Sequence, residues 1–205
     1  MWEVIQDAGW PIWPLIFTSM IAFAIIVERS VALRDSIVIP ENLLDNIELQ
    51  LQDGHLDEQA LASLSKSSLS GLMFATVIEN YSGTKEILND AIEKTGDAIS
   101  YQLEKYLYLL AMIATVAPLL GLFGTIVGMV ELFGSFTSDG QDVEQFARGI
   151  SVALYNTGGG IVVAIPAMIA HRIFRAKIDD QIHIMEKNSQ RIIKLCNTGD
   201  KQSCA

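Results

Sequence analysis

The sequence has little cysteine, only scattered histidine and no excess of positive charge. Its two cysteines, Cys196 and Cys204, lie in the polar C-terminal stretch without metal-ligand spacing. We therefore expect free thiols in a reducing compartment. His55, His171 and His183 are far apart, and a solvated or interfacial imidazole is the expected role of each. With no metal cluster, cofactor motif or catalytic signature, the sequence argues against an enzyme.

The charge balance is acidic, with 14 Lys and Arg against 24 Asp and Glu in 205 residues. The sequence also lacks a basic stripe and an aromatic platform, so nucleic acid is not an expected partner. Half of the residues are hydrophobic, and the 19% that are charged lie almost wholly outside three blocks. This distribution is typical of a membrane protein in contact with lipid.

The three apolar blocks, 8–27, 107–133 and 149–170, are each long enough for a membrane-spanning helix. A helix rises about 1.5 Å per residue and the hydrocarbon core is roughly 30 Å thick. Residues 1–7 contain two acids and no base, unlike the start of a secretory signal, so the first block is expected to remain as a span.

The basic residues next to the spans predict the orientation. Arg29 and Arg34 follow the first span, and a basic group that begins at His171 follows the third, whereas segment 134–148 has three acids and one arginine. The positive-inside rule then places 1–7 and 134–148 in the periplasm, and 28–106 and 171–205 in the cytoplasm. We predict an all-α integral membrane protein with three transmembrane helices and long helices that extend into the cytoplasm.

The segment 28–106 is interrupted by glycine and proline, which predicts several short helices and then a long one from about Thr84. Because no breaker follows, this long helix is expected to continue into the second span. Segment 173–195 is predicted to be amphipathic, and after Cys196 no pattern is found. Its apolar side is formed by Ile178, Ile182, Met185 and Ile192.

The second and third spans contain small residues at helical spacing, which let helices approach closely. In the second span these are Ala114, Ala117, Gly121, Gly124 and Gly128, and in the third Ala153, Gly160 and Ala164. One hydroxyl lies beside each stripe, Thr125 and Thr157. Two interpretations stay open: a hydrogen bond to a carbonyl one turn back, or the lining of a polar path.

Four further residues of the spans are candidates for polar or bending roles. Asn156 is a mid-span carboxamide, for which a hydrogen bond between helices is favoured. Glu131 follows the second apolar run, where an interfacial carboxylate is favoured over a functional one. Pro118 and Pro166 each remove a backbone donor and are expected to bend their helices.

Two blocks, APLLGLFGTIVGM at 117–129 and GISVALYNTGGGIVVAIPA at 149–167, resemble the second and third spans of the MotA/TolQ/ExbB proton-channel family. The first span, with its Glu28-Arg29 pair, is similar to the ExbB and TolQ branch. The resemblance covers nearly the whole chain in order and topology. It is specific in the GLFGT and AIPA blocks but not in the cytoplasmic insert.

The resemblance implies a homopentamer around the single spans of an ExbD-like or TolR-like partner dimer in the bacterial inner membrane. Ions, protons or in some branches sodium, would flow inward and drive an energy transducer similar to TonB or TolA. Thr125 and Thr157 match the two pore-facing threonines of the family, which favours the pore-lining interpretation.

One position departs from the family. Val152 occupies the place where ExbB-type and TolQ-type members have a glutamate, so the third span has no acidic residue. The ion-binding carboxylate is then expected on the partner, as a membrane aspartate, with Asn156 or Glu131 as possible contributors. The alternatives are a membrane scaffold without conduction, or a stator for motility. The cargo is not determined by the sequence.

Overall fold

The structure is a computed structural model that describes residues 9–40, 42–53, 58–134 and 143–198. All regular structure within these residues is helical, which confirms the all-α prediction. Three helices are long and apolar enough to cross a membrane, which confirms the three spans. The helices are α2 (Ile12–Ala32), α3 (Asp35–Val38), α4 (Leu43–Asp53), α5 (Glu58–Ser67), α6 (Leu69–Asn80), α7 (Lys85–Leu103), α8 (Leu107–Gly134) and α9 (Val143–Thr198).

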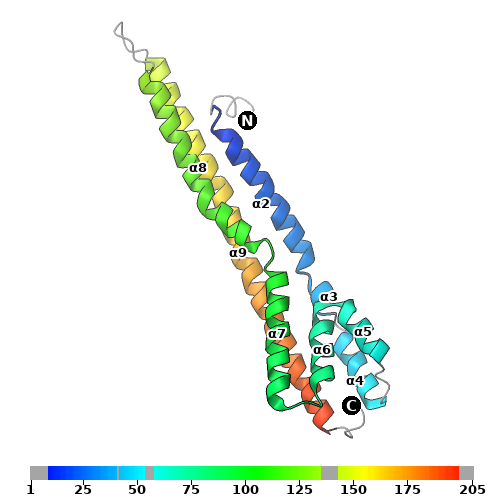
Figure 1. Cartoon of the computed structure of the whole chain (residues 1–205). Coiled ribbons are helices and arrows are strands. Elements are labelled where there is room, and N and C mark those ends of the chain that lie inside the picture. Colours follow the sequence, from blue (N-terminus) through cyan, green and yellow to red (C-terminus); the bar gives the residue numbers. More distant parts are fainter. Residues whose placement is uncertain (1–8, 41, 54–57, 135–142, 199–205) are drawn as a thin grey trace. The chain divides into compact units, whose positions relative to one another are not determined.

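The chain divides into two compact units, which share the long helix α9 (Figure 1). The membrane unit comprises Met1–Arg29 and Tyr106–Ile173. The extramembrane unit comprises Ser30–Lys105 and Phe174–Ala205. All three candidate spans contribute to the membrane unit, and the short helices belong to the other.

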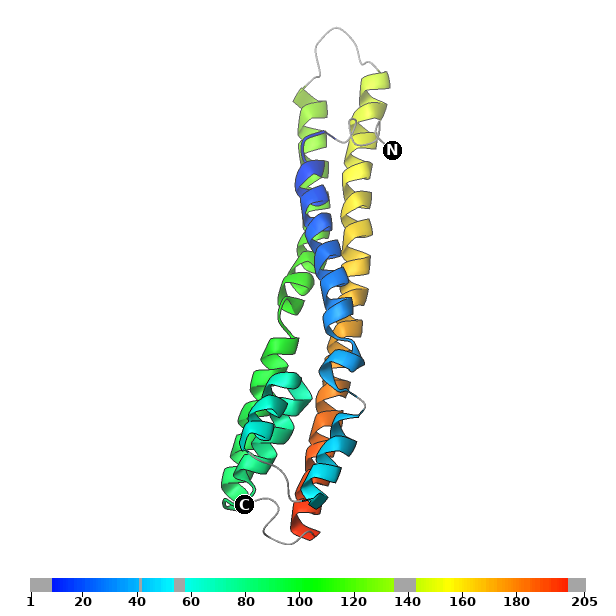
Figure 2. The ribbon, with the colours of Figure 1, turned by 90° about the vertical axis from the view of Figure 1, so that its right-hand side faces the viewer.

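In the membrane unit, α8 and the first part of α9 form an antiparallel pair, and α2 packs against both (Figure 2). Leu15 of α2 packs against Ala117 of α8 and Ala164 of α9, together with Leu120 and Val163. Both α8 and α9 continue through their prolines, Pro118 and Pro166.

The extramembrane unit confirms the expected series of short helices followed by a long one. The side chain of Ser68 caps α6 by accepting from the Gly71 N–H, and Thr84 caps α7 by accepting from the Ile87 N–H. More than half of the residues of helix α6 are buried. The last part of α9 buries Ile178, Met185 and Ile192, as the sequence predicted, whereas Ile182 is only partly buried and lines a cavity.

One expectation about a helix end was wrong. Helices α7 and α8 do not form one helix, because the chain turns at Glu104–Tyr106, where Tyr106 has a left-handed backbone with φ 69°. Helix α9 begins at Val143, and its candidate membrane span begins at Gly149. At the other end α9 extends to Thr198, and Cys196 is buried. Cys204 and His55 lie outside the described residues.

Candidate pore-facing site

The contact between α8 and α9 is made by glycines that bring the two backbones together. A Cβ built on Gly160 would lie 2.6 Å from the Ala117 carbonyl oxygen, and one on Gly121 would lie 2.7 Å from the Asn156 carbonyl oxygen. No side chain fits in this space, because the neighbouring atoms are backbone. A Cβ on Gly128 would lie in ordinary contact with Val152, at 3.4 Å. The small-residue stripes therefore serve the α8/α9 pair within one chain.

Asn156 lies inside this contact and is fully buried. Its amide donates a 3.1 Å hydrogen bond to the Val152 carbonyl, one turn back in α9. Across the pair, Asn156 packs on Gly124, where a Cβ would come within 2.6 Å of the Asn156 side chain. This hydrogen bond lies within one helix, and Asn156 also packs closely against α8. Asn156 thus lies within the α8/α9 contact itself.

Thr125 and Thr157 lie on the same side of the α8/α9 pair. Successive helical residues are rotated by about 100°. Thr125 follows buried Gly124 by one position, and Thr157 follows buried Asn156 by one. In two antiparallel helices, the residue that follows the contact residue by one position points to the same side of the pair in both helices. The Cα of Thr157 would lie 3.1 Å from a Cβ on Gly121, one turn from Thr125, so the two threonines are also at similar depth.

Helix α2 covers the opposite side of the pair. Leu120 and Val163, which pack with Leu15 of α2, each precede a buried small residue by one position instead of following it. Leu120 and Val163 are therefore rotated away from the α8/α9 contact in the direction opposite to Thr125 and Thr157. The threonines are left on the side of the α8/α9 pair that α2 does not cover.

The surface around the two threonines is apolar. Leu122 lies one turn from Thr125, and Leu154 and Ile161 lie one turn on either side of Thr157, all with exposed side chains. The Thr125 hydroxyl donates to the Leu122 carbonyl at 2.7 Å, as membrane threonines commonly do. Its oxygen can still accept a hydrogen bond. The Thr125 side chain can therefore bond the carbonyl one turn back and still line a polar path.

The two other candidate positions are separated from the threonines. Glu131 is exposed and precedes buried Leu132 by one position, which places it on the α2 side of the pair. It also lies about 9 Å further along α8 than Thr125. Val152 precedes buried Ala153 and lies on that side too. Neither position shares the threonine face.

One feature at the border of the membrane unit could not be predicted from the sequence. Arg29 is only 6% exposed, forms an ion pair of 2.6 Å with neighbouring Glu28, and stacks 5.3 Å above the ring of Tyr106. Tyr106 is the residue with the left-handed backbone. Without glycine or proline near 106, a break there was not predictable from turn residues.

The family model of the MotA/TolQ/ExbB proton channel family matches residues 57–187. The chain belongs to this family. It is 30% identical over 177 residues to the biopolymer transport protein ExbB of Salmonella typhimurium, covering 80% of this chain and 71% of that one. It is 26% identical over 170 residues to exbB1 of Vibrio cholerae serotype O1, with 80% and 74% covered. A protein of Synechocystis named as ExbB-like 3 is 30% identical, with 87% of both chains covered.

Membership of the MotA/TolQ/ExbB family confirms the resemblance found in the sequence, with ExbB proteins among the relatives. The family and the three apolar helices make this a membrane protein of the biopolymer-transport class. This is a family of transport and channel proteins, not a family of enzymes.

Proposed function

We propose that this chain is the ring-forming subunit of an ion-driven stator in the bacterial inner membrane. Several copies, five by the resemblance, would surround the single span of an ExbD-like or TolR-like partner. Ion flow along the ring would do mechanical work on an energy transducer similar to TonB or TolA. The ion is most simply a proton, given the family description.

One observation supports this proposal above the others: two hydroxyls share an apolar face on the side of α8 and α9 that α2 leaves open. A helix carrying one carboxylic acid fits such a face. In an apolar surrounding the carboxyl of the partner would favour its neutral form, and the threonine hydroxyls would exchange hydrogen bonds with it. The described part of the face offers no acid of its own, since Val152 and Glu131 lie elsewhere.

The orientation belongs to the same proposal. Arg34, Lys177 and the other basic residues next to the spans belong to the extramembrane unit or border it, and the positive-inside rule then makes that unit cytoplasmic. The N-terminus and the segment between α8 and α9 would face the periplasm.

A non-conducting scaffold is the second candidate, because the membrane unit has a valine at the family's glutamate position. Flux separates the two. We expect vesicles that contain this chain with its single-span partner to conduct protons, and vesicles with either chain alone to conduct far less. Equal, background-level flux in all three, with the complex shown to be assembled, would support the scaffold instead.

A further inference from the structure

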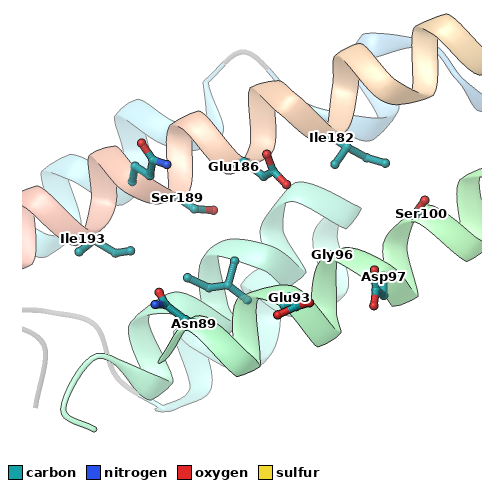
Figure 3. Close-up of a pocket in the computed structure, with 11 residues that line it drawn as sticks. Asn89, Glu93, Gly96, Asp97, Ser100, Ile182, Glu186, Ser189 and Ile193 are labelled. Carbon is teal, nitrogen blue, oxygen red and sulfur yellow. The ribbon is translucent and has the colours of Figure 1, made fainter. Parts of the chain in front are cut away.

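Helices α7 and α9 are joined at two places and leave a groove between them within the extramembrane unit. At one end Arg175 pairs with Glu104 at 2.5 Å. Towards the other end, the Tyr81 hydroxyl, just before α7, donates to the Asn197 amide oxygen at 2.7 Å. Between these contacts lies a cavity of about 440 Å³ (Figure 3). A second cavity, of about 650 Å³, adjoins it through shared Asn89 and Ile193.

The groove combines an apolar floor with an acidic rim. Isoleucines contribute from both helices, Ile92 from α7 and Ile182 and Ile193 from α9. Figure 3 shows Ile182 and Glu186 projecting from α9 towards α7. The carboxylates at this cavity are Glu93, Asp97 and Glu186, all exposed. Lys85 is the base that lines the adjoining cavity, at the far end.

None of these three carboxylates forms an ion pair among the described residues, a property that they share with the exposed Glu86 and Asp180. Lysine and arginine side chains are instead paired with Asp35, Glu48, Asp90, Glu104 and Asp179. What distinguishes the groove is that its three exposed acids lie together beside isoleucines. An occupant that matches this surface has apolar and positively charged side chains.

We propose that this groove binds a cationic amphipathic segment of a partner membrane protein, the stretch next to its span. Cytoplasmic flanks of membrane spans are rich in lysine and arginine. The groove residues of α7, from Asn89 to Ser100, lie between about 5 and 20 Å along the helix from its last residue, Leu103, after which the chain enters α8. An extended segment covers about 20 Å in roughly six residues. The inference rests on the proposed function for the existence of such a partner.

The test uses the full chain in nanodiscs of zwitterionic lipid, without the partner, and a fluorescent probe. The probe is a helical peptide of about 15 residues made of leucine and lysine. The groove variant combines Glu93→Gln, Asp97→Asn and Glu186→Gln. The matched control combines Glu86→Gln, Asp90→Asn and Asp180→Asn, and it removes the same number of exposed carboxylates from the same two helices outside the groove. Empty nanodiscs give the lipid background.

We expect the groove variant to bind the probe about tenfold more weakly than the wild-type chain, and the control to bind like the wild type. A peptide of serine and lysine should bind more weakly than the probe, and one of leucine and glutamate should not bind above background. Equal loss in groove and control variants would overturn the proposal, as would equal affinity for the serine and leucine peptides.

Two further outcomes would assign the groove to another occupant and thus also contradict the proposal. Tighter probe binding after removal of residues 199–205 would make the chain's own tail the occupant. Loss of the oligomer in the groove variant, measured by native mass spectrometry, would make the groove a contact between copies. Because the probe assay needs no ion flux, its result is independent of whether the assembly conducts.

Discussion

The two parts of α9 bury their inner sides by opposite means. In the membrane unit its buried positions are mostly small, Ala153, Gly160, Ala164 and Ala167, and glycines bring the backbones together. In the extramembrane unit they are large, and include Phe174, Ile178, Met185 and Ile192. One uninterrupted helix thus changes its packing chemistry where the chain passes from one unit to the other.

The difference follows from the solvent. Lipid is as apolar as leucine, so burying large side chains between membrane helices gains little, and close contact between backbones stabilises the pair instead. In water the burial of apolar area is the main driving force, at roughly 25 cal/mol per Å². Ion pairs of α9 with other elements also occur only in the extramembrane unit among the described residues, as Arg175–Glu104, Lys177–Asp35 and Arg191–Glu48.

The largest loss of stability is expected where a side chain is added to the contact between α8 and α9. Gly160→Ala should destabilise the membrane unit by about 3 kcal/mol or more, because the new methyl would lie 2.6 Å from the Ala117 carbonyl oxygen and 3.1 Å from the Gly121 Cα of α8. Gly158→Ala is the matched control, since no atom lies within 4 Å of its Cβ position. Thermal unfolding in detergent measures both. Equal stability of the two variants would break the comparison.

In the extramembrane unit, removing a large buried side chain is expected to destabilise the protein. Met185→Ala should lower the free energy of unfolding by about 2 to 3 kcal/mol, since Met185 is fully buried and its removal leaves a cavity. The exposed neighbour Glu186→Ala should change it little. Denaturant unfolding followed by circular dichroism distinguishes the two variants. An unchanged stability of Met185→Ala would mean that this side of α9 is not part of a hydrophobic core.

A smaller effect is expected at Gln181, a buried polar residue on the large-residue side of α9. Its amide donates to the Leu33 carbonyl at 3.0 Å, just after the end of α2, and to an Asp35 carboxylate oxygen at 2.7 Å. Gln181→Leu should cost about 1 to 2 kcal/mol by leaving that carbonyl without its donor. A stability equal to wild type in the same unfolding assay would show that water replaces the amide.

The smallest effect concerns acid. The hydrogen bond from Gln181 lowers the pKa of Asp35, and Lys177 lowers it further. Since the folded pKa lies below the unfolded one, this stabilisation is present above about pH 4 and is lost as the pH falls through the folded pKa. Asp35 is largely exposed, so less than about 1 kcal/mol is expected. Asp35→Asn should flatten this part of the stability profile between pH 5 and 2, and an unchanged profile would contradict the assignment.

The sequence predicted best what depends on periodicity and poorest what depends on contacts far along the chain. The three spans and the buried side of the last part of α9 follow from hydropathy and helical spacing. The α7–α8 break was missed because Tyr106 is neither glycine nor proline. Its left-handed turn lies under the Arg29 guanidinium, more than seventy residues away in the chain. Helical spacing placed Thr125 and Thr157 beside the small-residue stripes of their helices. That the two threonines lie on the same side of the pair could be seen only once the structure showed that α8 packs against α9 and where α2 packs.

The most direct test of the central claim, that these two threonines line an ion path, is proton flux through vesicles that contain the chain with its single-span partner. We predict that Thr157→Val abolishes or strongly reduces flux while the ring stays assembled. Thr18→Val, the same change in α2, where the hydroxyl bonds its own helix, should leave flux intact. Unchanged flux in an assembled Thr157→Val ring would contradict the claim.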